Sequence, residues 1–206
     1  SNAQSRVIDS ALLQFDIPYR VYGGQRFFER LEIKNALAYM RLILNCHDDV
    51  AFERVVNIPP RGIGERTVDA VREHARNISI SMWSAAKAMI VDKNLNTRSA
   101  NALAAFLNLI NEMTNTLEAL PLSELAENSI EMSGLIEMHR REKGERGQSR
   151  VENLEELVGA CKNFTPESID TPVLAQFLDQ VSLEAGERQA NEDQDAVQLM
   201  TLHSAK

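Results

Sequence analysis

Residues 57–67 read NIPPRGIGERT and combine features of a phosphate-binding turn. Gly62 and Gly64 flank the apolar Ile63, which can pack between the helices on either side. Glycine permits conformations and close approaches of the main chain that a side chain would hinder. Main-chain N–H groups at the start of a helix bind anions, because the helix dipole places positive charge there. Three neighbouring side chains can add contacts: Arg61, Arg66 and Thr67. Such a turn would bind the nucleic-acid backbone without reading bases.

A plain corner between two helices is the alternative interpretation of these residues. Pro59 and Pro60 end the preceding helix, because proline lacks an N–H and restricts the residue before it. A new helix is expected to begin near Glu65, with Val68 on its apolar face. Residues 54–76 contain five arginines against three acidic residues, and this local excess of positive charge favours contact with DNA.

The composition is that of a globular chain with one or two domains. Of 206 residues, 44% are apolar and 25% are charged. The net charge of −8 argues against a protein that coats nucleic acid, although it leaves room for a local site. Without a long apolar run or a secretory signal, the sequence predicts a cytoplasmic protein with no membrane partner. Residues 1–3 resemble the remnant of an affinity tag.

Apolar residues recur at helical spacing through most of the chain. The pattern is clear in residues 27–45, 82–90, 103–117, 151–161 and 173–181. Strand-like segments occur only at 19–22 and 196–202. The sequence therefore predicts a mainly α fold, a helical bundle with short β segments at both ends. Trp83 is expected in the core, and the carboxylates of the helix around 152–156 are expected to face solvent.

Residues 19–42 (YRVYGGQRFFERLEIKNALAYMRL) and 197–206 (VQLMTLHSAK) bracket RGIGERT and EKGERGQSRVENLEELV in a fixed order. In these motifs the chain resembles the UvrD-type DNA helicases, the branch of superfamily 1 that includes UvrD, PcrA and Rep. The resemblance covers residues 4–206 and implies the helical 2B subdomain at 25–189. Residues 4–24 and 190–206 would belong to the motor domain 2A, the latter ending within helicase motif V.

The resemblance implies part of an ATP-dependent 3′-to-5′ DNA helicase that acts in DNA repair. Within it, the turn at Gly62, Ile63 and Gly64 would contact duplex DNA ahead of the fork. Arg30, Glu32 and Lys34 match a junction motif, in which Lys34 is a further candidate for DNA contact. Three motif V residues would contact the single strand: Thr201, His203 and Ser204.

The chain itself is predicted to have no catalytic, cofactor-binding or metal-binding residues. No G-x-x-x-x-G-K-[ST] phosphate loop occurs, so ATP and magnesium would bind elsewhere in the full-length helicase. Cys46, Cys161 and the four histidines are scattered without metal-ligand spacing. Expected partners are a duplex–single-strand DNA junction, repair proteins, and a second copy of the chain through the truncated ends. The alternative function is a docking or regulatory module with little DNA binding of its own.

Overall fold

The computed structural model describes residues 8, 11, 12, 15, 17, 19–22, 27–186 and 197–200. It is mainly helical, which confirms the helical part of the predicted fold class. The helices are η1 (Phe27–Glu29, a 3₁₀ turn), α2 (Leu31–Leu44), α3 (Asp49–Val55), α4 (Glu65–Asn77), α5 (Met82–Val91), α6 (Thr97–Thr114), α7 (Leu122–Ser133), α8 (Leu135–Arg140), α9 (Glu145–Asn163) and α10 (Val173–Gly186).

The starts of several helices are capped by their own side chains. Asp48, Ser81 and Asn96 precede α3, α5 and α6, and each accepts a hydrogen bond from a main-chain N–H in the first turn. Such a bond satisfies one of the donors that every helix start leaves unpaired. Helix α4 differs, because its N-cap is Gly64 and no side chain caps it.

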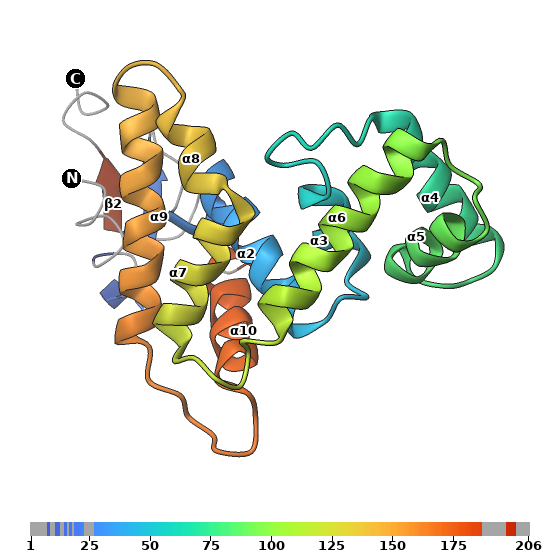
Figure 1. Ribbon diagram of the computed structural model, residues 1–206. Coiled ribbons are helices and arrows are strands. Elements are labelled where there is room, and N and C mark those ends of the chain that lie inside the picture. Colours follow the sequence, from blue (N-terminus) through green and yellow to red (C-terminus); the bar gives the residue numbers. More distant parts are fainter. Residues whose placement is uncertain are drawn as a thin grey trace. The chain divides into compact units, whose positions relative to one another are not determined.

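Residues 35–163 form one of two compact units. Within it α7, α8 and α9 pack side by side, and α5 packs against α3, α4 and α6 (Figure 1). The Phe52 and Phe106 rings join α3 to α6 in an edge-to-face pair, with centroids 5.5 Å apart. Trp83 is buried and Glu152 and Glu155 on α9 are exposed, as expected, whereas Glu156 is half-buried.

Gly147 determines how closely α9 approaches the end of α8. A Cβ atom placed on Gly147 would lie 2.5 Å from the carbonyl oxygen of His139 and 2.7 Å from that of Glu142. No side chain fits at that distance. The Glu142 carboxylate also accepts hydrogen bonds from His139 Nδ1 at 2.7 Å and from Arg150, which ties the connection between α8 and α9 to both helices.

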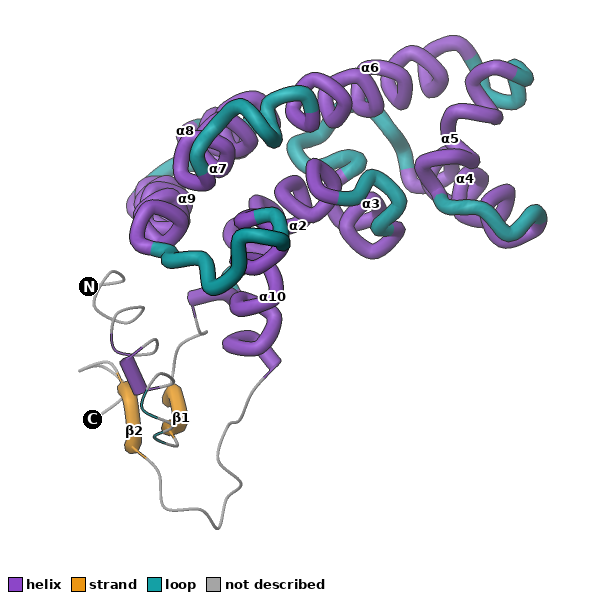
Figure 2. The backbone as a smooth tube through the Cα atoms, turned by 90° about the horizontal axis from the view of Figure 1, so that it is seen from below, coloured by secondary structure: helices purple, strands orange, loops and turns teal. Residues whose placement is uncertain are grey.

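Residues 1–34 and 164–206 form the other unit. Its strands β1 (Tyr19–Tyr22) and β2 (Val197–Met200) pair in parallel, with Tyr19 opposite Val197 (Figure 2). Helix α10 packs against η1 in the same unit. The assignment of these strands to a truncated motor domain, and the predicted boundaries at 24/25 and 189/190, stay predictions.

Among the described helices, none has the length and apolar character needed to cross a membrane.

Candidate nucleic-acid interface

The turn between α3 and α4 is shaped by one asparagine side chain. Asn57 Oδ1 accepts hydrogen bonds from the main-chain N–H groups of Arg61, at 2.7 Å, and Ile63, at 3.2 Å. Gly62 lies between them with φ of +79°, a conformation that side-chain-bearing residues rarely adopt. Asn57 was not among the predicted site residues, although asparagine before a turn often bonds nearby main-chain groups.

Ile63 anchors the turn while the glycines beside it face solvent. Ile63 is 1% exposed, as its position between two helices led us to expect, whereas Gly62 and Gly64 are exposed. Gly64 has an ordinary extended conformation, with φ of −72° and ψ of 160°. A Cβ atom on Gly64 would meet no atom within 4 Å, so its outer surface is open to a ligand.

Helix α4 begins at Glu65, as predicted, and exposes main-chain donors there. The Gly64 carbonyl accepts from the N–H groups of Thr67, at 2.9 Å, and Val68, at 3.2 Å. Within residues 27–186, no hydrogen bond occupies the main-chain N–H groups of Glu65 and Arg66. The Arg66 side chain is exposed beside them. Donors, helix dipole and a cation therefore meet at one point of the surface.

Arg61 is directed into the protein, although it was predicted to contact DNA. Its guanidinium donates to the carbonyl oxygens of Pro59, at 2.9 Å, and Ser133, at 2.8 Å. It also lies 5.7 Å from the ring centroids of both Tyr39 and Phe106. These contacts tie the turn to the end of α7 and to the core, so Arg61 has a structural role. Its contact with DNA is untested and stays a prediction.

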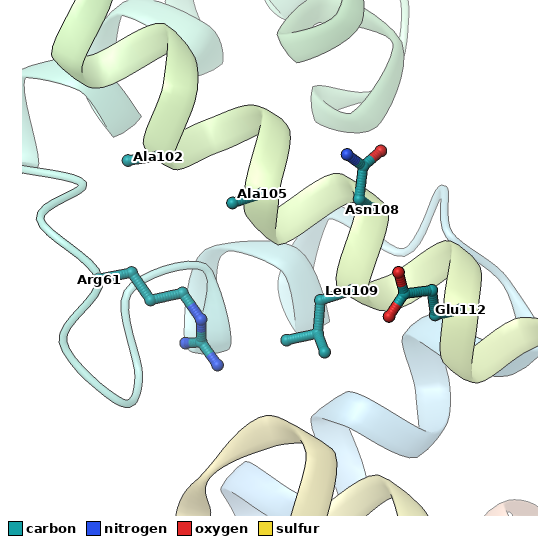
Figure 3. A pocket seen from close by; sticks show the side chains of 6 residues that line it. All are labelled: Arg61, Ala102, Ala105, Asn108, Leu109 and Glu112. Atoms are coloured by element: carbon teal, nitrogen blue, oxygen red, sulfur yellow. The ribbon is translucent and has the colours of Figure 1, made fainter.

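A pocket of about 610 Å³ lies between Arg61 and one face of α6. Figure 3 shows the Arg61 side chain extending from the turn toward this face. The α6 residues that line the pocket are Ala102, Ala105, Asn108, Leu109 and Glu112. Since the guanidinium already has two carbonyl partners and the lining is largely small and apolar, we assign no ligand to this pocket.

Thr67 also bonds within the protein. Its side chain is 9% exposed, and Oγ1 donates a 3.1 Å hydrogen bond to Oγ of Ser99 on α6. This hydroxyl, which was predicted to contact phosphate, joins the first turn of α4 to the first turn of α6. Its contact with DNA is untested and stays a prediction.

Tyr39 contacts the main chain that leads into the turn. Its hydroxyl donates to the carbonyl oxygen of Ile58 at 2.5 Å and lies 3.4 Å from that of Val55. Burial raises the pKa of Tyr39 to about 12, and the nearby Arg61 guanidinium opposes part of that rise. The phenol is therefore a neutral donor across the physiological range.

The remaining sequence-predicted residues belong to the other unit or lie outside the described residues. Lys34 is exposed on α2 and belongs to the unit of residues 1–34 and 164–206. Thr201, His203 and Ser204 lie outside the described residues. Their roles stay predictions.

Comparison with known proteins establishes the family. The model of the UvrD-like helicase C-terminal domain matches residues 1–206. The chain is 53% identical over 208 residues to DNA helicase II of Escherichia coli, covering 100% of this chain and 29% of that protein. It is 37% identical over 212 residues to the ATP-dependent DNA helicase PcrA of Bacillus subtilis, covering 100% of this chain and 28% of that protein. The expected resemblance is confirmed, and the chain belongs to the UvrD-like helicase C-terminal domain family.

Proposed function

We propose that this chain is part of an ATP-dependent 3′-to-5′ DNA helicase acting in DNA repair, and that residues 57–67 bind the duplex backbone. The proposal of a helicase rests on family membership. The proposal of a binding site rests on one observation: the exposed turn presents the main chain of Gly62 and Gly64 beside the uncapped start of α4. Phosphate oxygens are suitable acceptors for these donors.

The turn supplies the two properties that a backbone-binding element needs. The first is a fixed shape, which Asn57, Ile63 and Arg61 maintain through contacts that leave the outer surface free. The second is positive potential, from the dipole of α4 and from the exposed Arg66. None of these groups is specific for a base, so binding is expected to be independent of sequence.

The other proposed contacts follow the family resemblance. Lys34 is proposed to contribute a weaker contact, and Thr201, His203 and Ser204 are proposed to contact the single strand. ATP and magnesium would bind to parts of the full-length helicase beyond this chain, since its sequence contains no phosphate loop. Repair proteins and a second copy of the chain are proposed partners, and the location is proposed to be cytoplasmic.

Substitution of Gly64 provides a direct test of the turn. In Gly64→Ala the new methyl group meets no protein atom within 4 Å but occupies the surface where a phosphate would approach. The folding cost at an N-cap is below about 1 kcal/mol. Affinity for duplex DNA, measured by fluorescence anisotropy, is expected to fall about tenfold, or about 1.4 kcal/mol, equally for unrelated sequences.

The matched control is Gly159→Ala on α9, where a Cβ atom also meets no atom within 4 Å. It should retain the parent affinity. If the parent binds duplex and Gly64→Ala binds equally well, the turn is only a corner between helices. If the parent chain binds no duplex, the alternative function of a docking module replaces the proposed one.

A further inference from the structure

The first turn of α6 is fastened beside the turn of residues 57–67. The hydrogen bond from Thr67 Oγ1 to Ser99 Oγ joins the two helix starts, and both side chains are 9% exposed. The Ser99 main-chain N–H in turn donates to Asn96 Oδ1 at 2.9 Å. These two bonds hold the main chain of Ser99 in place, and with it the residue that precedes Ser99.

That residue is Arg98, and its guanidinium lies next to Gly62. A Cβ atom placed on Gly62 would be 4.0 Å from a terminal nitrogen of Arg98. Arg98 is exposed, and within residues 27–186 its side chain makes no ion pair or hydrogen bond. Because Gly62 has no side chain, nothing separates this cation from the exposed main chain of the turn.

We propose that Arg98 is the second cationic residue of the phosphate-binding turn and acts together with Arg66. This inference rests on the proposed function, since it names a residue of the same site. Proximity in sequence favours Arg61 for this role, but the Arg61 guanidinium is occupied by two carbonyl oxygens inside the protein. A guanidinium can donate two parallel hydrogen bonds to one phosphodiester, so its free edge suits the DNA backbone.

Thr67 then acts as a positioning residue for Arg98. Its hydroxyl is engaged with Ser99, and removal of that bond would loosen the first turn of α6 against α4. A direct phosphate contact by Thr67 and an indirect effect through Arg98 can be told apart. If the contact is direct, replacement of Thr67 weakens binding whether or not Arg98 is present. If the effect is indirect, replacement of Thr67 weakens binding only when the Arg98 guanidinium is present.

The test is the salt dependence of duplex binding by the 206-residue chain and by Arg98→Gln. Loss of one phosphate contact is expected to reduce the slope of log affinity against log salt by about 0.9, equally for unrelated sequences. Arg66→Gln should have a similar effect, and the double variant should lose about twice as much. The control Arg141→Gln removes one charge from an exposed pair with Glu137 and should keep the parent slope.

Folding and positioning are checked separately. Because Arg98 is exposed, Arg98→Gln should retain the parent circular dichroism and melting temperature. Thr67→Val should weaken binding in the parent and cause no further loss in Arg98→Gln. If Arg98→Gln is folded and its affinity falls with salt as steeply as that of the parent, the role of Arg98 is overturned while the proposed function stays intact. If the losses of duplex affinity caused by Thr67→Val and Arg98→Gln add up in the double variant, the positioning role of Thr67 is overturned. If the parent chain binds no duplex, both proposals are overturned.

Discussion

Arg61→Ala should destabilise the fold much more than Arg66→Ala, although both replace an arginine of the same turn. Arg61 donates to the carbonyl oxygens of Pro59 and Ser133, and hydrogen bonds that involve a charged group contribute about 1.5–3 kcal/mol each. Arg61 is only half-buried, so the lower value applies, and two such bonds give about 3 kcal/mol. Removal of a surface side chain such as Arg66 costs within about 0.5 kcal/mol.

The assay is thermal unfolding followed by circular dichroism. For a chain of this size, about 3 kcal/mol corresponds to a melting temperature lower by about 6–12 °C. Arg61→Lys retains the charge but lacks the guanidinium fork that reaches both carbonyl oxygens, so it should fall between the parent and Arg61→Ala. Equal melting temperatures for Arg61→Ala and Arg66→Ala would refute the structural role of Arg61.

Three further perturbations test other parts of the structure. Gly147→Ala should cost at least about 2 kcal/mol of unfolding free energy, because its Cβ would lie 2.5 Å from the His139 carbonyl oxygen, whereas Gly159→Ala should not destabilise. Since burial raises the pKa of Tyr39 from 10.0 to about 12, its contribution is fully present below pH 10 and should be lost as pH rises to about 12. Urea titrations should show a loss of about 2–3 kcal/mol that is absent in Tyr39→Phe. Gln176→Ala removes side-chain hydrogen bonds to the main chain of Glu167, Ser168 and Thr171, so limited proteolysis should cut residues 164–172 faster than in the parent.

The sequence alone was sufficient for features that depend on near neighbours in the chain. The start of α4 at Glu65, the burial of Ile63 and Trp83, and the exposure of Glu152 all follow from helical periodicity and turn chemistry. Each depends on residues within a few positions, where the pattern of apolar and polar side chains is informative. The family was also evident, because its motifs are contiguous segments in a fixed order.

Only the tertiary structure assigned partners to the polar side chains of the turn. Arg61 donates to Ser133, 72 positions away, and Thr67 bonds Ser99, 32 positions away. Neither pairing leaves a periodic signal, because a single hydrogen bond between distant segments depends on how whole helices pack. The same packing places Arg98 beside Gly62 and brings the backbone of α8 within contact of Gly147. The residue types of the site could therefore be identified from the sequence, whereas the direction in which each side chain points was determined by packing between helices.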